Sequence, residues 1–292
     1  MDSRFRHTAE SVRRDIESAL NKVGLLCRVF GRGKDPRSIE AKLNREKGKY
    51  SLGGKLIQDA IGIRIALYFA EDVHIVEHLL SSEFALDKQA SNIDIHATDQ
   101  FTVTRHNLVY RSPERYVTEM RRNIGDMPID TAFEVQLRSV LSEGWHEVDH
   151  DLRYKSKENW KDQDDLSRAL NGIMATLETS EWSMRKIFDE LAYRHYRHHN
   201  WTAMLHCLVR MRASPHLSDE LSNLLDKSPE IAKDTLRISR AKVIHKLANL
   251  HPSIPISLDN IVYVWNYIEP KDADVLSLTP SVILDALAEA QP

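Results

Sequence analysis

The 292-residue chain has little cysteine and no long apolar run, and each shortage excludes a class of protein. Its two cysteines, Cys27 and Cys207, stand far apart and form no Cys-x-x-Cys or Cys/His finger spacing, which argues against a disulfide framework or a structural zinc site. No stretch approaches the roughly 20 apolar residues that span a bilayer, and the start MDSRFRHTAE lacks the apolar run of a signal peptide. We therefore expect a soluble, cytoplasmic protein without membrane contacts.

Net charge is also nearly absent, but its distribution is uneven. Lys and Arg number 40 against 43 Asp and Glu, a net charge of −3, so the chain as a whole does not attract polyanions. The segment from Arg28 to Lys49 nevertheless contains eight basic and three acidic residues, a net +5. Any polyanion chemistry is therefore expected to be local.

Hydrophobic residues make up 42% of the chain, enough for one large core or two modest ones. Apolar spacing predicts a helix that starts at Phe5 and stops at Gly24, and a second helix over 71–81. Alternation predicts strands over Ile61–Phe69, Phe101–Tyr110 and Thr131–Arg138, and from Ser139 the pattern is helical. The predicted fold is α+β followed by an all-α region, and a composition shift near residue 190 predicts domains over 1–190 and 191–292.

The basic segment has the pattern of a phosphate-binding element. Arg32 and Lys34 are predicted in a Gly-bearing loop, and Ser38 and Lys42 would share one face of a following helix, with Pro36 near its first turn. Backbone NH groups, helix dipole and cations converge at such a junction and suit a phosphate chain. A solvated basic helix is the alternative.

Two carboxylates form a second candidate site. Asp59 precedes one predicted strand, and Glu134 lies within another, in a row with Gln136 and Arg138 on one strand face. Carboxylates brought together by a sheet hold magnesium, and one of them can take a proton from an attacking hydroxyl. The alternative is a pair of unrelated surface residues.

Two histidine patterns contain the residue type that metal sites use. The string from His146 to His150 matches His-Glu-x-x-His, but nothing downstream provides a further zinc ligand. The cluster that contains His195, His198, His199 and His206 is interleaved with basic and aromatic residues, which favours packing or nucleic-acid contact over metal.

Three ordered motifs over roughly residues 25–160 resemble the synthetase domain of the RelA/SpoT family. Arg32, Lys34, Ser38 and Lys42 match R-x-K-x-x-x-S-x-x-x-K, and DAIGIR, Asp59 to Arg64, matches D-x-x-G-x-R. The block FEVQLRSVLSEGWHEVDHDLRYK matches the family's E-[IV]-Q-[IL]-R…W…H…YK pattern, which places the His-Glu-x-x-His string in a structural helix.

The resemblance implies a nucleotidyltransferase-like mixed sheet flanked by helices, and transfer of the β,γ-pyrophosphate of ATP to a ribose 3′-hydroxyl, as in alarmone synthesis. Arg32 and Arg64 would sandwich the adenine, and Lys34, Ser38 and Lys42 would hold the triphosphate. Asp59 and Glu134 would bind Mg²⁺, with Glu134 also the base. Gln136 and Arg138 would face the acceptor.

The acceptor loop departs from the family's G-Y-x-S-x-H, because this chain has FTVTRH from Phe101 to His106. His106 is retained and Thr104 replaces the serine, but Thr102 replaces the tyrosine that would stack on guanine. A guanosine nucleotide is the first expected acceptor, and adenine nucleotides or the CCA end of tRNA, as in toxins of the family, are the alternative. For tRNA, a basic groove would be lined by Arg111, Arg115, Arg121 and Arg122, and a solvated charged loop is the alternative.

Partners follow from the same resemblance. No hydrolase domain fits the chain, so a neutralising antitoxin is one candidate partner, and a second copy of the chain is another. A non-catalytic nucleotide-sensing module remains the alternative to an enzyme.

Overall fold

The computed structural model describes residues 5–94 and 106–290 and divides the chain into two compact units. The first unit comprises Met1–Ser18 and Cys27–Glu181, and the second comprises Ala19–Leu26 and Trp182–Pro292. The expected fold class is confirmed: a mixed sheet flanked by helices is followed by a helical region. The predicted domain boundary at 190 lies within helix α6 (Asp164–Arg197) and stays a prediction.

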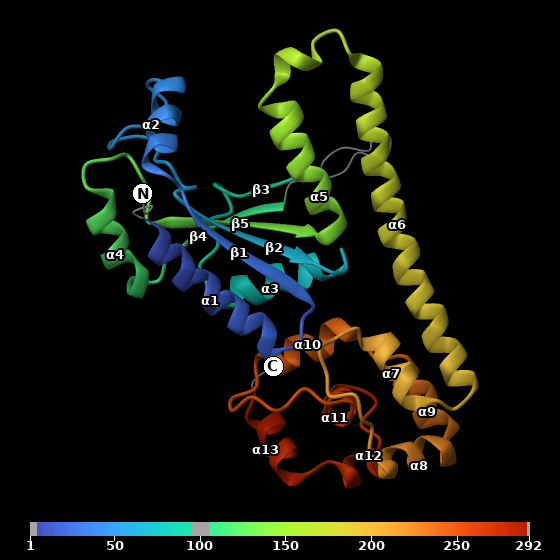
Figure 1. Cartoon of the computed structure of the whole chain (residues 1–292). Coiled ribbons are helices and arrows are strands. Elements are labelled where there is room, and N and C mark those ends of the chain that lie inside the picture. Colours follow the sequence, from blue (N-terminus) through green and yellow to red (C-terminus); the bar gives the residue numbers. More distant parts are fainter. Residues whose placement is uncertain (1–4, 95–105, 291–292) are drawn as a thin grey trace. The chain divides into compact units, whose positions relative to one another are not determined.

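A five-stranded sheet in the order β1-β2-β5-β4-β3 forms the centre of the first unit (Figure 1). The strands are β1 (Cys27–Gly33), β2 (Ile61–Leu67), β3 (Asn92–Ile93), β4 (His106–Arg111) and β5 (Ala132–Ser139). The central β2–β5 pair is parallel, and the β1–β2, β4–β5 and β3–β4 pairs are antiparallel. The predicted strands at 61–69 and 131–138 correspond to β2 and β5, and the described end of the 101–110 strand is β4.

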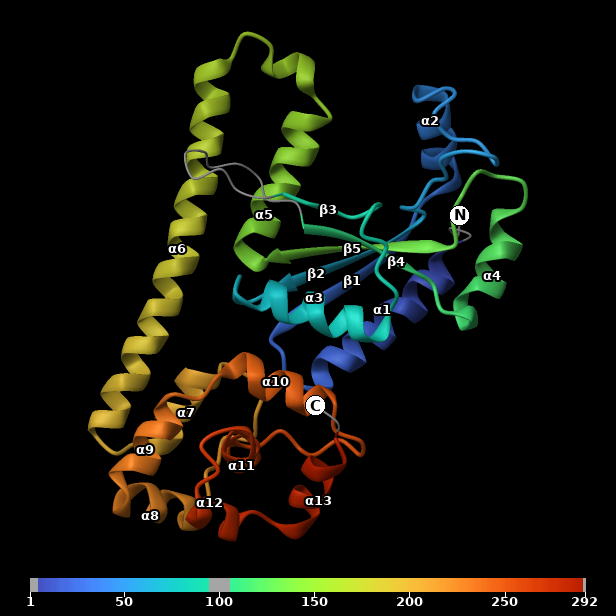
Figure 2. The ribbon, with the colours of Figure 1, turned by 180° about the vertical axis from the view of Figure 1, so that it is seen from behind.

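One face of the sheet is apolar and covered by α1 (Arg6–Lys22) and α3 (Asp72–Glu83), which lie on the same side in both ribbon views (Figures 1 and 2). Fully buried residues of this layer include Ile16 on α1, Ile65 on β2 and Val135 on β5. Burial of a continuous apolar layer is the main stabilising contribution in such a unit. This face is therefore the core.

The prediction that Arg32 lies in a loop is wrong: Arg32 belongs to strand β1 and pairs with Gly62 in the antiparallel β1–β2 ladder. The glycines of the segment have a packing reason. A Cβ on Gly33 would lie 2.5 Å from the carbonyl carbon of Phe5, and one on Gly31 would lie 2.9 Å from Cβ of Arg13. The glycines thus allow α1 to approach the strand closely.

The other face of the sheet is polar, and α5 (Val140–Val148) stands on its side (Figures 1 and 2). Ser139 caps α5, its side chain accepting a hydrogen bond from the Ser142 amide. The helix continues as a π-helical turn over Asp149–Tyr154, followed by a 3₁₀ turn over Lys157–Trp160. Trp145 Nε1 donates to the carbonyl of Leu170 and so joins α5 to the first part of α6.

Two further helices complete the first unit. Helix α2 (Pro36–Arg45) follows β1, with Pro36 in its first turn and the Asp35 side chain accepting from the Arg37 amide. Helix α4 (Glu114–Ile124) follows β4 and carries Arg121 and Arg122 in its last turn.

The second unit contains the remainder of α6 and the helices that follow it. These are α7 (Trp201–Val209), α8 (Asp219–Lys227), α9 (Pro229–Leu236), α10 (Arg240–Ala248), α11 (Leu258–Ile268), α12 (Ala273–Leu278) and α13 (Ser281–Glu289). Six consecutive residues of α11, 261–266, are buried, so this helix is covered on all sides and is the central helix of the unit. None of the helices in the described part of the chain is both long and apolar enough to cross a membrane.

Candidate active site on the polar face of the sheet

The polar face is organised by strand register into rows of side chains. In one row, Arg32 lies opposite Gly62, which lies opposite Glu134. In the next, Phe30, Arg64, Gln136 and Asn107 are consecutive partners across four strands. Side chains of paired residues point to the same face, so the register brings together predicted residues that are up to about a hundred positions apart.

Asp59, just before β2, is held by two lysines of the basic segment. Lys34 Nζ donates to Asp59 Oδ2 at 2.6 Å, and Lys42 Nζ lies 3.0 Å from both carboxylate oxygens. Burial opposes ionisation of Asp59, but the hydrogen bond and charge of Lys34, together with those of Lys42, hold its pKa below the usual range. The predicted phosphate-binding lysines and the predicted metal carboxylate therefore form one cluster.

Glu134 on β5 has the opposite electrostatic character. Burial and, secondly, the nearby charge of Asp59 raise the pKa of Glu134. Its carboxylate accepts hydrogen bonds from Asn107 Nδ2 at 3.0 Å and from Gln136 Nε2 at 3.3 Å. Two carboxylates with pKa values pushed apart are typical of a site in which one group binds charge and the other takes up a proton.

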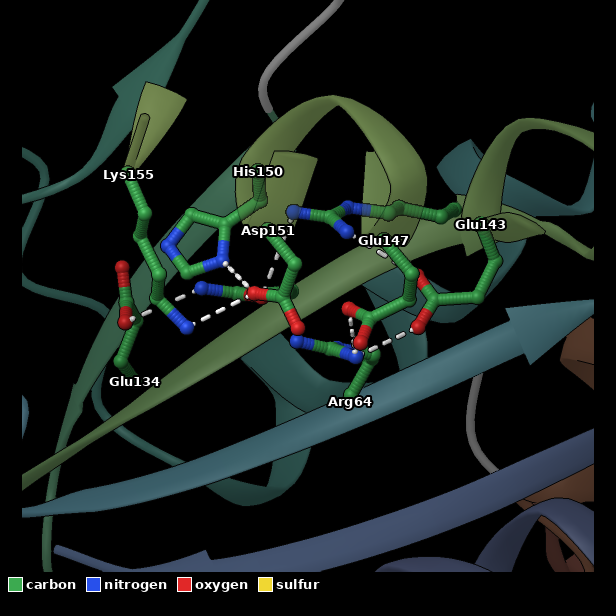
Figure 3. Close-up of polar contacts among 9 residues, drawn as sticks. Arg64, Glu134, Glu143, Glu147, His150, Asp151 and Lys155 are labelled. Atoms are coloured by element: carbon green, nitrogen blue, oxygen red, sulfur yellow. Dashed lines mark hydrogen bonds and ion pairs between the residues drawn. The ribbon is translucent and has the colours of Figure 1, made fainter. Parts of the chain in front are cut away.

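Arg64 is held from α5 by two glutamates (Figure 3). Its Nη1 lies 2.6 Å from Glu143 Oε1 and 2.5 Å from Glu147 Oε1. Glu143 also accepts from Arg138 Nη1 at 3.0 Å through its other oxygen, and Arg138 Nη2 donates to Gln136 at 3.4 Å. A connected network therefore runs from Glu134 along β5 to Arg64.

The remaining predicted donor-site residues are solvent-accessible. Arg32 is exposed at the β1 edge of the polar face, in the row of Gly62 and Glu134. Ser38 is exposed on α2, four residues before Lys42 and thus on its side of the helix. A Cβ on Gly62 would find no atom closer than 3.9 Å, so the sheet surface between Arg32 and Glu134 is bare.

The predicted acceptor residues are divided. Gln136 and Arg138 share the face of Glu134, as the strand alternation predicts. His106 does not join them: it is buried on the other face, where its Nε2 lies 3.0 Å from Glu77 Oε2 of α3, and burial lowers its pKa. Thr104, with Phe101 and Thr102, lies outside the described residues. The acceptor roles of His106 and Thr104 stay predictions.

Three residues of the network are not among the predicted site residues. Asn107, Glu143 and Glu147 contact Glu134, Arg138 or Arg64 directly. Glu143 and Glu147 are four residues apart, so the sequence could have predicted that they share one face of a helix. Asn107 directly follows His106 in the sequence, and its cross-strand pairing with Gln136 shows that it lies on the polar face of the sheet.

The His-Glu-x-x-His string does not form a metal site. His146 is buried beside Trp145, and His150 Nδ1 lies 2.9 Å from Asp151, which also binds Lys155 at 2.7 Å (Figure 3). No group of three or more His, Cys, Asp or Glu side chains that could hold a metal occurs within 5–94 and 106–290.

The polar face thus gathers two carboxylates, two lysines and two arginines, residue types that bind nucleotide phosphates and their metal ions. In a comparison with known protein families, residues 31–159 match the family model described as a region found in RelA / SpoT proteins. The match covers 129 of the 292 residues and shows similarity to this family for that segment.

Solved structures include similar chains. The small alarmone synthetase 1 from Bacillus subtilis is 20% identical, with 63% of this chain and 92% of that chain covered and a TM-score of 0.48. The same enzyme bound to its product pppGpp gives 20% identity, coverage of 65% and 95%, and a TM-score of 0.49. A GTP pyrophosphokinase family protein from Streptococcus pneumoniae gives 18%, 63% and 89%, and 0.44. No curated protein matches the chain.

Proposed function

We propose that the first unit transfers the β,γ-pyrophosphate of ATP to the ribose 3′-hydroxyl of a guanosine nucleotide. The observation that carries this proposal is the juxtaposition of Lys34, Lys42 and Asp59 with Glu134 on one sheet face. The acceptor oxygen would form a bond to the β-phosphorus, the bond from that phosphorus to the α,β-bridging oxygen would break, and AMP would leave.

The donor would bind through the basic segment and the two arginines. Lys34, Ser38 and Lys42 would neutralise the triphosphate, because an anionic phosphorus is attacked only once its charge is offset. Arg64 is suited to stacking on adenine. The carboxylates of Glu143 and Glu147 hydrogen-bond its guanidinium at Nη1, and bonds along the edge of this planar group leave its faces open.

Asp59 and Glu134 fit a magnesium ion. They are near enough for the charge of Asp59 to raise the pKa of Glu134, and Mg²⁺ in nucleotide sites typically takes one or two carboxylates together with substrate phosphates. When bound there, Mg²⁺ would offset phosphate charge and polarise a phosphoryl oxygen.

Glu134 would accept the proton of the attacking hydroxyl. Its raised pKa strengthens it as a base relative to an ordinary carboxylate, and the amides of Asn107 and Gln136 orient its two oxygens. Gln136 and Arg138 would contact the acceptor from the same strand face.

The test incubates the purified chain with Mg²⁺, γ-labelled ATP and, separately, GDP, GTP, AMP or deacylated tRNA. We expect label in GDP or GTP and AMP as the co-product, and Glu134→Gln should reduce transfer by about a thousandfold or more while ATP still binds. Label in tRNA or in an adenine nucleotide instead would show that the acceptor is not a guanosine nucleotide. ATP binding without label in any acceptor would favour a nucleotide-sensing module instead.

A further inference from the structure

An exposed aromatic ring stands on the polar face of the sheet. Phe30 of β1 is 55% exposed, and it is the only exposed aromatic side chain on the described residues of the five strands. Its neighbour Val29 points to the apolar face and is buried against the core. A single exposed apolar side chain is common on protein surfaces, so the exposure by itself carries no weight.

The exposure of Phe30 matters because its ring lies beside Arg32 and Arg64 in the rows of the polar face. Arg32 pairs with Gly62 and Phe30 pairs with Arg64, so these four residues form a square on adjacent strands with the two arginines at diagonal corners. A flat group held between the guanidinium planes of Arg32 and Arg64 would therefore lie above the other diagonal. That diagonal consists of the Phe30 ring and the bare backbone of Gly62.

The chemistry of this square matches a purine base. Guanidinium groups stack on the two faces of a base, and a phenyl ring below it offers its edge an apolar contact, whereas a phosphate or a ribose hydroxyl gains nothing from a phenyl ring. The predicted phosphate-binding cations lie beyond the side of the square formed by Arg32 and Gly62: Lys34 directly follows β1, and Lys42 lies on α2. The base and phosphate ends of a nucleotide would thus meet different residues.

We propose that Phe30 contacts the purine base of the ATP donor and contributes to its selection. This inference rests on the proposed function. Phe30 lies outside the three motifs that resemble the RelA/SpoT family, so its role is a property of this chain's own sequence.

The test measures equilibrium binding of a non-hydrolysable ATP analogue, its cytidine counterpart and inorganic triphosphate to the full chain with Mg²⁺. In Phe30→Ala we expect the Kd of the ATP analogue to rise about tenfold, because the base loses its apolar contact with the phenyl ring. The preference for the adenine over the cytosine analogue should fall, and the Kd of triphosphate should not change. Phe30→Tyr should bind like the unaltered chain.

The matched control is Ile93→Ala, which removes an exposed apolar side chain from β3 at the opposite edge of the same sheet. It should leave all three dissociation constants unchanged. Unchanged binding of the ATP analogue by Phe30→Ala would overturn the inference, as would equal weakening of the analogue and of triphosphate. If the unaltered chain bound neither probe, the proposed function itself would fail, which is a distinguishable result.

Discussion

Asp59 and Glu134 show how neighbouring carboxylates acquire different properties from their surroundings. Asp59 faces two ammonium groups, which offset its burial and keep it ionised. Glu134 is more deeply enclosed and receives only neutral amide donors, so its ionised form is disfavoured. The fold therefore bears a cost at Glu134 that a neutral side chain would not incur.

This cost predicts that Glu134→Gln stabilises the protein while it abolishes transfer. A pKa raised in the folded state means that ionisation of Glu134 lowers stability above the unfolded-state pKa, about 4.5, and has no effect well below it. The variant should have a Tm a few degrees higher at pH 7.5, and the difference should disappear near pH 4. Thermal unfolding across this pH range measures it, and a lower Tm at pH 7.5 would contradict the pKa direction.

Gly62 is a second residue whose identity the protein's own packing does not require. A Cβ there would contact nothing within 3.9 Å, and glycine within a strand costs about 0.5–1 kcal/mol. We expect Gly62→Val to be at least as stable as the unaltered chain but to bind ATP about tenfold or more weakly, because its side chain would occupy the bare surface beside Glu134. Thermal unfolding and ATP titration separate the two effects. Destabilisation together with unchanged binding would show that the glycine serves the fold.

At the scale of elements, the spacing of apolar residues predicted individual strands and helices and the faces of their side chains. Alternation located β2 and β5 and placed Glu134, Gln136 and Arg138 on one face, and helical spacing located α1. Strand β1 was mistaken for a loop because its glycines read as turn residues, whereas their cause is the approach of α1. Contacts such as Asn107 to Glu134 depend on cross-strand register, which no local pattern contains.

The approach of α1 to β1 can be tested at Gly33. A Cβ there would lie 2.5 Å from backbone of Phe5, and backbone cannot move aside as a flexible side chain can. We expect Gly33→Ala to lower the free energy of unfolding by about 2–3 kcal/mol, measured by urea titration. Gly53→Ala is the control, since a Cβ at Gly53 meets nothing within 4 Å. Equal stability of the two variants would contradict the packing account of β1.

Strand orientation also predicts the role of His106. Because its side chain pairs with Glu77 of α3 on the face away from Glu134, we expect His106→Ala to destabilise the fold by about 1–3 kcal/mol. The acceptor KM of the folded variant should stay within twofold of the original. Unchanged stability with a raised acceptor KM would instead support the acceptor role that the family resemblance implies.

At the scale of the whole molecule, the chain passes between its two units more than once. The end of α1 and the following turn, Ala19–Leu26, group with the second unit, although the residues on either side belong to the first. Within that unit the Arg212 amide donates to the Gly24 carbonyl at 2.8 Å, and Arg212 Nη1 donates to Asn21 at 2.7 Å. The composition shift at 190 gave no sign of this arrangement because it reflects only neighbouring residues.

The arrangement predicts that a chain cut after residue 190 is impaired although it retains residues 31–159, which match the RelA / SpoT family model. The cut removes Arg212 and the helices that group with Ala19–Leu26, so Val23 and Leu25, both buried in the full chain, lose part of their covering. We expect residues 1–190 to unfold at a Tm several degrees lower and to bind a hydrophobic dye that the full chain does not bind. Val23→Ser and Leu25→Ser in the shortened chain should reduce the dye signal. A shortened chain with the Tm of the full chain would show instead that residues 1–190 form a self-sufficient domain.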